Sequence, residues 1–407
     1  MAAGYYLSRG HEVTLFEKDT RVGGHTHTVR TGGSGASGGG GIAVDTGFIV
    51  HNERTYPNLV KLLAELGVAT QPSDMSFAVM SRRTGFEYSS RGLAGFFAQR
   101  GNFLRPAHYG LLKEILRFNR EAPRWLAAHA DDDATIGDFL DQGRYAAYFV
   151  ERYLFPMASA VWSMPFDTMR AFPAMTLLRF FDNHGMLGID THPQWKTIRG
   201  GSNEYIAPIT RPYRERIRTG VEISGVRRDA SGVTVTVRGE AGERFDEVVF
   251  ACHGDQVLPM LEDATDAERE IMGRFRNTLN VVTLHTDSSL LPQRPAARAS
   301  WNYNLDLNGP GTVAVTYHMN RLQDLKADRE YCVTLNGGAA IDESKVLRRI
   351  EYEHPLYNRD AIRAQQRWGE ISGLHHTHYC GAYWFYGFHE DGLLSALRVA
   401  RGLGVAC

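Results

Sequence analysis

Residues 11–29 read HEVTLFEKDTRVGGHTHTV, and this stretch decides the fold. His11 to Glu17 alternates apolar and polar side chains and closes in an acid, which predicts a strand. Met1 to Arg9 has the pattern of the second half of a helix, and Gly10 stands just past its end. A helix, a glycine and a strand closing in Glu form the second half of a βαβ unit. We therefore expect the first strand and its GxGxxG turn to precede Met1, in a chain truncated at its N-terminus.

The residues after this strand can bind an adenine nucleotide. A carboxylate at the position of Glu17 can accept hydrogen bonds from both hydroxyls of an adenosine ribose. Gly23 and Gly24 have no Cβ, so their backbone can approach a pyrophosphate closely, and Arg21 can add a charge-assisted contact. The sequence leaves two locations open for His25, which are beside that pyrophosphate or facing solvent. An ordinary strand-to-loop turn explains the same residues, and the missing GxGxxG would remove the usual phosphate-binding helix N-terminus.

The other end of the chain carries a second candidate site. Residues 387–392 read GFHEDG and open a predicted amphipathic helix over 392–402. A helix N-terminus carries partial positive charge and unsatisfied N–H groups. It can therefore stabilise the negative charge at the N1/C2 carbonyl edge of a reduced flavin. Alternatively, Asp391 simply caps the helix.

Composition limits the classes of function. The chain has 407 residues, with 45 Lys and Arg against 46 Asp and Glu, so its net charge of −1 gives no whole-chain attraction for nucleic acid or acidic membranes. Its length predicts two or three domains, and no apolar run approaches the ~18 residues of a transmembrane span. Four widely spaced cysteines without a CxxC pair predict neither a disulfide framework nor a zinc site, and a cytoplasmic location fits best.

The remaining pattern predicts a mixture of helices and strands. The glycine-serine run 31–41 is typical of a flexible surface loop, and residues 86–192 are mainly helical in pattern. Their Phe-, Met- and Trp-rich part, 149–181, suits a core or a cavity wall. Helical spacing also predicts a helix within 52–67 and a helix followed by a loop over 344–364. Strands are expected at 221–226, 233–238, 247–251, 277–286 and 312–319.

Histidines and one cysteine stand near the candidate sites without defining a metal centre. His27 follows the glycine pair, and residues 375–378 read HHTH. Three or four converging ligands are needed for a metal, so no metal site is predicted. Cys252 follows a predicted buried strand and is interpreted as a small buried side chain, while His253 begins a loop near the cofactor.

Five segments occur in one order along the chain: EKDTRVGGHTHTV, VDTGFIVHNERTYPNL, IRGGSNEYI, VVFACHGDQVLPML and GAYWFYGFHEDGLLSALRVA. With them the chain resembles the flavin-containing amine oxidase superfamily, in particular its bacterial branch of predicted NAD/FAD-binding proteins. The resemblance implies an α/β (α+β mixed) fold of the glutathione-reductase type. Its FAD-binding, Rossmann-like domain would comprise 1–75, 195–255 and 365–407, and an inserted sheet-plus-helix substrate domain would comprise 76–194 and 256–364.

The resemblance also implies roles for particular residues. Glu17 matches the ribose-binding acid, and Arg21, Gly23 and Gly24 match the pyrophosphate loop. Asp45 to Gly47 match a stretch beside the flavin, Val221 begins a strand facing the adenine, and Glu390 would contact the ribitol or the pyrophosphate. The cofactor-binding positions outside residues 17–25 are thus Asp45, Thr46, Gly47, Val221, Gly387, Glu390, Asp391 and Gly392.

Other positions are less specific. Gly200 and Gly201 are interpreted as the N-terminal turn of a helix. Lys196 is the nearest candidate for the lysine that contacts a water at flavin N5 in many amine oxidases. Tyr383, Trp384 and Tyr386 either face the flavin or pack in the core, and no catalytic residue is assigned.

The implied activity is that of an FAD-dependent oxidoreductase, which transfers a hydride from a substrate C–H bond to flavin N5. The small-molecule substrate is either an amine or a lipid-like, unsaturated chain, and the sequence leaves this choice and the oligomeric state open. One alternative is a non-catalytic flavoprotein-like subunit with impaired FAD binding, for example an accessory to fatty-acid modification. An NAD(P)-dependent dehydrogenase would also use the ribose-binding acid, but it would not explain the GFHEDG segment.

Overall fold

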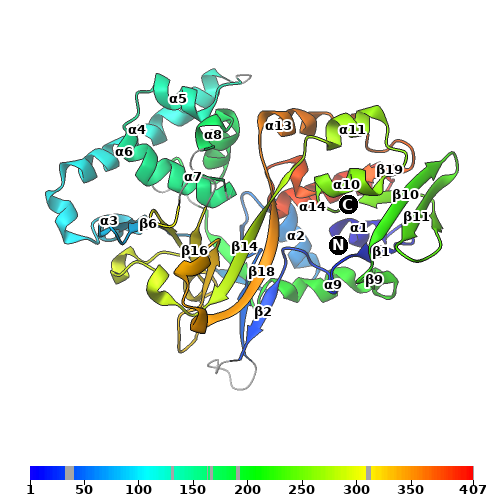
Figure 1. The fold of residues 1–407 in the computed structure, drawn as a ribbon, viewed down its shortest axis with the longest axis horizontal. Coiled ribbons are helices and arrows are strands. Elements are labelled where there is room, and N and C mark those ends of the chain that lie inside the picture. Colours follow the sequence, from blue (N-terminus) through cyan, green and yellow to red (C-terminus); the bar gives the residue numbers. More distant parts are fainter. Residues whose placement is uncertain are drawn as a thin grey trace.

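The computed structural model describes residues 1–32, 41–129, 133–162, 164–165, 168–188, 193–308 and 313–406. Most of the predicted glycine-serine loop, residues 33–40, lies outside the described residues, as does Cys407. Helices and strands are interspersed along the chain, which confirms the prediction of a mixed fold. Figure 1 shows a helical region on the left, a large sheet in the middle, and on the right the half that contains both chain ends.

The large sheet has seven strands in the order β18-β14-β17-β16-β15-β6-β7. β15 runs parallel to β6, and the other neighbouring pairs are antiparallel. All seven strands lie within the ranges that the sequence assigned to the substrate domain. Their bounds are β6 (Phe77–Ser81), β7 (Phe86–Ser89), β14 (Asn277–His285), β15 (Trp301–Asn304), β16 (Val315–His318), β17 (Cys332–Leu335) and β18 (Val346–Pro355).

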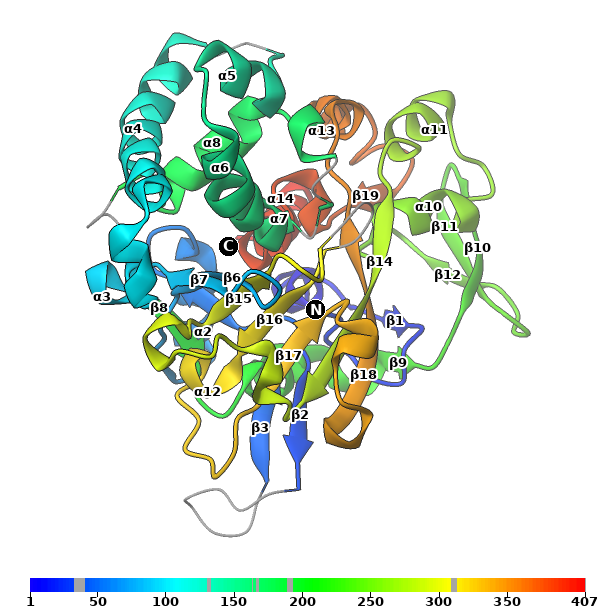
Figure 2. The ribbon, with the colours of Figure 1, turned by 60° about the vertical axis from the view of Figure 1, so that its left-hand side comes forward.

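Helices cover the β6–β7 end of this sheet (Figure 2). After β7, the described part of 86–192 is mainly helical, as predicted, and aromatic residues such as Phe118, Phe149 and Phe181 fill its core. α4 begins at Pro106, where the missing N–H of proline costs no hydrogen bond. Along the described residues, no helix combines the length and the apolar composition needed to cross a bilayer. The elements are α3 (Gly92–Phe96), the 3₁₀ helix η1 (Arg100–Leu104), α4 (Pro106–Ala128), α5 (Ile136–Gln142), α6 (Ala147–Phe149), the π-helical turn η2 (Val150–Leu154), α7 (Phe155–Trp162) and α8 (Ala174–Asn183).

Smaller sheets build the other half. β1 pairs in parallel with β9, and β13 with β19. The predicted strands near 221–226, 233–238 and 247–251 correspond to β10, β11 and β13. The bounds are β1 (Leu15–Glu17), β2 (Thr28–Thr31), β3 (Ile42–Asp45), β4 (Val50–Asn52), β5 (Thr70–Pro72), β8 (Trp195–Ile198), β9 (Ile217–Thr219), β10 (Ile223–Asp229), β11 (Gly232–Val237), β12 (Glu243–Phe245), β13 (Val248–Phe250) and β19 (Thr377–Tyr379).

The first and last helices of the described chain share one apolar core. Ala3 of α1, Leu397 of α14 and Leu59 of α2 belong to the same buried cluster, so the two chain ends are packed together (Figure 1). The apolar positions of α14 recur at helical spacing, as its sequence predicts. The helices outside the α3–α8 region are α1 (Ala2–Leu7), α2 (Pro57–Glu65), α9 (Ile206–Thr210), α10 (Gly254–Met260), α11 (Asp266–Met272), α12 (Met319–Leu322), α13 (Arg359–Gln366) and α14 (His389–Gly402).

The prediction of a helix followed by a loop over 344–364 is wrong. Residues 346–355 form the edge strand β18, which pairs with β14 over nearly its whole length, and a helix, α13, follows it. The sequence VLRRIEYEHP contains good helix formers, Arg and Glu. At a sheet edge their charged side chains reach water, so tertiary pairing outweighs the local preference.

A buried ion cluster ties β10 to α11 and β19. Arg228 donates to Glu268 at 2.6 and 2.9 Å and to Asp263 at 2.9 Å, and the Tyr379 hydroxyl donates to Glu268 at 2.5 Å. The side chains of Arg228 and Glu268 are only 4% and 2% exposed. Burial raises the pKa of Glu268, but the hydrogen bonds from Arg228 and Tyr379 outweigh it and hold that pKa at about 2. The cluster therefore fixes β19, whose C-terminal end leads to the site described below.

Replacing Glu268 by Ala leaves the Arg228 charge buried without its main partner. We expect a loss of about 3–5 kcal/mol in the free energy of unfolding, measured by urea denaturation. Glu343→Ala, which breaks the exposed pair with Arg349, serves as the control and should change little. Because the pKa of Glu268 is depressed, its contribution is complete above its usual value of 4.5 and is lost as the pH falls toward about 2. A stability difference that stays constant from pH 6 to pH 2 would contradict this assignment.

Candidate functional site

A cavity of about 1220 Å³ lies between the two halves of the molecule. Ligand pockets usually measure roughly 300–1,000 Å³, so this one has room for a cofactor together with a substrate. It is lined both by segments from the half that holds the chain ends and by the helices and sheet of the other half.

The wall on the side of the chain ends is built from loops at strand ends. β13 and β19 are parallel, so their carboxyl ends share one edge, and the residues that follow them, 251–253 and 380–383, line the cavity. Open α/β sheets bind ligands outside such carboxyl ends. The start of α1 and the loop around Gly23 complete this wall.

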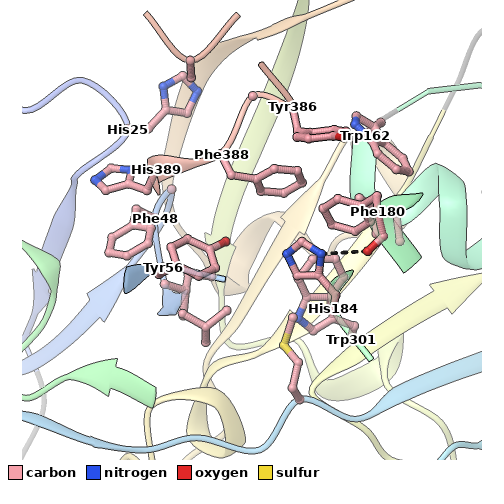
Figure 3. Close-up of a pocket in the computed structure, with 18 of the residues that line it drawn as sticks. His25, Phe48, Tyr56, Trp162, Phe180, His184, Trp301, Tyr386, Phe388 and His389 are labelled. Carbon is pink, nitrogen blue, oxygen red and sulfur yellow. Dashed lines mark hydrogen bonds between the residues drawn. The ribbon is translucent and has the colours of Figure 1, made fainter. Parts of the chain in front are cut away.

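A hydrogen-bonded junction joins the early loop to the start of the last helix. His389 Nε2 lies 3.2 Å from Thr26 Oγ1 and 2.6 Å from Tyr205 Oη. The Phe48 ring stacks on the His389 ring with centroids 3.8 Å apart. Burial, with a contribution from His51, lowers the pKa of His389 to about 4, so its imidazole is neutral at pH 7. Figure 3 shows the His389 and Phe48 rings of this junction beside the aromatic part of the cavity.

The structure brings some of the predicted cofactor residues to this cavity and leaves others outside its lining. Those that line it come from both chain ends and are Gly23, His25, Thr46, Gly47, Gly387 and Gly392. Those outside its described lining are Glu17, Arg21, Gly24, Asp45, Val221, Glu390 and Asp391. Cofactor contact remains a prediction for all of them.

Glu17 does not line the cavity, but its charge acts on Cys252, which does. Glu17 ends β1, its carboxylate accepts the Asp19 N–H at 2.9 Å, and its carbonyl accepts the Val221 N–H at 3.1 Å. Burial, with smaller contributions that include the Glu17 charge, raises the pKa of the Cys252 thiol to about 12. Cys252 is therefore protonated at neutral pH, as expected for a cysteine without thiolate activation.

Arg21 and Asp45 form hydrogen bonds with other residues of the protein. Arg21 donates to the carbonyls of Thr26 at 3.1 Å and Gly24 at 2.7 Å, which shapes the glycine loop. The Asp45 carboxylate accepts from Thr28 Oγ1 at 2.6 Å and from Ser202 N at 2.8 Å. Asp45 therefore positions the backbone of Thr46 and Gly47, which do line the cavity.

Glu390 and Asp391 both serve helix N-termini. Glu390 accepts the backbone N–H groups of Asn58 at 3.0 Å and Leu59 at 2.9 Å, at the start of α2. Asp391 accepts the Phe388 N–H at 2.8 Å, so it caps α14, which is the simpler of the two sequence interpretations. Burial raises the pKa of Asp391 to about 7.

The opposite wall of the cavity is aromatic, and the sequence predicted only part of it. The rings of Phe180 and Phe388 stack with centroids 4.9 Å apart, and those of Phe180 and His184 with centroids 3.8 Å apart. Trp162 and Trp301 also line the cavity, from α7 and from β15 (Figure 3). The density of Phe, Met and Trp in 149–181 marked part of this wall, but nothing in the sequence indicated that Trp301 joins it.

The cavity wall contains several buried polar atoms that a ligand could contact. His25 Nε2, Trp162 Nε1, Trp301 Nε1 and Tyr357 Oη are buried and have no hydrogen-bond partner among the described residues. Buried polar atoms are normally hydrogen-bonded. Burial, with contributions from His354 and His253, lowers the pKa of His25 to about 3, so its neutral ring can exchange one hydrogen bond with a ligand. His25 Nε2, beside the glycine loop, therefore suits a polar cofactor.

The remaining candidates have partners within the protein. His27 Nδ1 lies 3.0 Å from Tyr352 Oη, and His376 and His378 both contact Glu247. Within the described ranges, no group of three or more His, Cys, Asp or Glu side chains is arranged to hold a metal ion. Lys196 forms an ion pair with Glu53 at 2.5 Å.

The glycine pair 200–201 has the geometry of a helix start. Gly200 and Gly201 have φ values of 87° and 99°, in the left-handed region that favours glycine. A 3₁₀ helix begins directly after them at Ser202.

Comparison with known protein families decides the assignment. The family described as flavin containing amine oxidoreductase matches residues 1–340. The chain belongs to this family. The protein is therefore an FAD-dependent oxidoreductase, as the order of the five sequence segments predicted, and the unpartnered polar atoms and the large cavity are compatible with FAD.

Solved structures share its fold. A wild-type putrescine oxidase bound to putrescine has a TM-score of 0.71 at 14% identity, over 99% of this chain and 96% of that one. Cyclohexylamine oxidase from Brevibacterium oxydans has a TM-score of 0.69 at 15% identity, over 99% and 96%. A fatty acid isomerase from P. acnes that produces CLA has a TM-score of 0.66 at 17% identity, over 98% and 95%. No curated protein matches the chain in sequence.

Glu390→Ala should separate the capping role from a cofactor role. Loss of the carboxylate leaves the first N–H groups of α2 without their acceptor, so the cofactor-free protein should lose about 1–2 kcal/mol in its free energy of unfolding, measured by urea denaturation. Glu215→Ala, at an exposed glutamate, is the control. Unchanged stability of the cofactor-free variant combined with weaker FAD retention would instead support the predicted ribitol or pyrophosphate contact.

Proposed function

We propose that this oxidoreductase takes a hydride from a carbon atom of an apolar, chain-like substrate, either lipid-like or unsaturated. The observation that carries this proposal is the cavity lining. Among the described lining residues, Glu353 is the only acid, and Lys and Arg are absent. Glu353 itself lies 2.9 Å from His253 Nδ1, on the side of the chain ends.

The apolar lining continues far from the predicted cofactor side. Phe96 of α3 and Leu112, Ile115 and Leu116 of α4 line the cavity, together with Met157 of α7. An apolar chain that buries its surface there gains about 25 cal/mol per Å². A charged ammonium group would lose its hydration with no carboxylate beside it among these residues, which is costly.

An amine is the second candidate, because one observation favours it. The rings of Trp162, Tyr386 and Phe388 lie together at the cavity (Figure 3). Aromatic ring faces attract cations within about 6 Å. Two of the structural neighbours are oxidases named for amines, putrescine and cyclohexylamine.

In the proposed function, one wall of the cavity binds the cofactor and the opposite wall binds the substrate. FAD, when bound, supplies the hydride acceptor at flavin N5. The loop around Gly23 and His25 and the residues after β13 would hold its polar part, while Thr46, Gly47 and the start of α14 would lie beside the ring. The neutral His389 keeps this junction free of a formal charge. On the opposite wall, Phe180 and Trp162 exclude water and orient the substrate.

Anaerobic mixing of the FAD-loaded protein with candidate substrates tests this function. A long-chain unsaturated fatty acid should bleach the visible flavin absorbance band and yield a product lighter by two hydrogens, detected by mass spectrometry. Ile115→Glu places a carboxylate in the apolar wall, and we expect the KM for the fatty acid to rise at least tenfold, about 1.4 kcal/mol. Ile115→Val is the matched control.

Two outcomes would overturn the proposal. Bleaching by hydrophobic amines but not by fatty acids would establish the amine as substrate. A flavin that stays oxidised with every substrate of both classes would favour a non-catalytic subunit.

A further inference from the structure

Exposed large apolar residues concentrate in one short stretch of the molecule. Of nine such residues among those described, five lie between positions 93 and 116, on α3, η1 and α4. They are Leu93 (71% exposed), Phe103 (54%), Leu104 (87%), Tyr109 (48%) and Leu116 (44%). We call this set the apolar patch. Contiguous exposed apolar surface marks a binding site for a protein, a membrane or a ligand.

The apolar patch is continuous with the interior of the cavity. Leu93 and Leu116 belong to the patch and also line the cavity. Their neighbours Phe96, Leu112 and Ile115 line it further in. The cavity therefore reaches the surface beside α3 and α4, where the exposed apolar side chains of Leu93 and Leu116 stand at its mouth.

The same stretch is strongly basic, although the chain as a whole is nearly neutral. Residues 91–124 contain seven Lys and Arg and two Glu, a net charge of +5, whereas the whole chain has a net charge of −1. Both of these acids, Glu114 and Glu121, are paired with the half-buried Arg117. The remaining cations are exposed and are Arg91, Arg100, Arg105, Lys113, Arg120 and Arg124.

α4 carries apolar and basic residues on one exposed face. Tyr109, Lys113, Leu116 and Arg120 are spaced by four, three and four residues, so they lie on the same side of the helix. All four are exposed. Apolar side chains with Lys and Arg beside them are typical of helices that lie in a membrane interface.

We propose that the α3–η1–α4 face docks onto the surface of a membrane that contains anionic lipids. The basic residues complement phosphate headgroups, and the apolar patch inserts below them. A nucleic acid would leave Leu93 and Leu104 without a partner, because their side chains cannot bind phosphate. The opening of the cavity within the patch favours a bilayer over a protein partner, since a docked protein would close the mouth.

Docking would place the mouth of the cavity at the boundary between headgroups and acyl chains. Interfacial helices bury their apolar face about 5–10 Å into this region. A lipid-like substrate could then pass from the bilayer into the cavity without crossing water. This route rests on the proposed function, whereas the docking itself does not.

Co-sedimentation of the purified FAD-loaded protein with vesicles tests the docking without any substrate. We expect binding to vesicles of phosphatidylglycerol and phosphatidylcholine, and at least tenfold weaker binding to phosphatidylcholine alone. Raising the salt concentration should weaken the binding, because screening shortens the range of the attraction. Absence of binding to either vesicle, or equal binding to both, would overturn the proposal, whatever the substrate proves to be.

Two double variants separate the charge from the apolar insertion. Arg100→Glu with Arg120→Glu, and Leu93→Asp with Leu104→Asp, should each weaken binding to anionic vesicles at least tenfold. Lys61→Glu with Arg276→Glu, and Leu374→Asp, change exposed residues elsewhere and should leave binding unchanged. Unaltered circular dichroism and melting temperature verify that each variant is folded. Equal losses in the controls, or full binding by either patch variant, would contradict the docking face.

Discussion

The junction between the two chain ends is the constraint on which the rest of the site depends. α1 and α14 share a core, and the Thr26–His389–Tyr205 hydrogen bonds join residues that are 363 positions apart in sequence. Without this junction, the glycine loop and the start of α14 would not line the same cavity. The cofactor side of the site is therefore a product of the long-range packing of apolar helix faces, with hydrogen bonds that fix their register.

Several polar residues that the sequence predicts as cofactor contacts form hydrogen bonds within the protein. Asp45, Glu390 and Asp391 each satisfy backbone or hydroxyl donors, and the groups left to meet a ligand are neutral ones, such as the imidazole of His25. A neutral lining suits redox chemistry on carbon, because hydride transfer needs no permanent charge beside an apolar chain. The buried charges of Arg228 and Glu268, by contrast, compensate one another in an ion pair away from the cavity.

The sequence predicts the fold well where local pattern and tertiary packing agree. The β1 acid, the glycine loop, the final helix and the mainly helical 86–192 region follow from periodicity and turn residues, and the order of five segments predicts the family. It fails at β18, where helix formers pair as an edge strand, and it does not indicate which residues outside 149–181 complete the aromatic wall. Trp301 and Trp162 come from distant elements, so their convergence depends on packing that no local spacing encodes. The contact of Glu390 with α2 could not be predicted either, because Leu59 lies 331 positions away from it along the chain.

The carboxylate of Glu390 links two helices from opposite ends of the chain. It belongs to the first turn of α14, yet it holds the amino end of α2, and α2 contributes Leu59 and Leu62 to the cavity. Because one side chain belongs to α14 and also holds the start of α2, the placement of each helix depends on the other. Leu59 and Leu62 thus owe their place beside the cavity in part to a carboxylate from the opposite end of the chain.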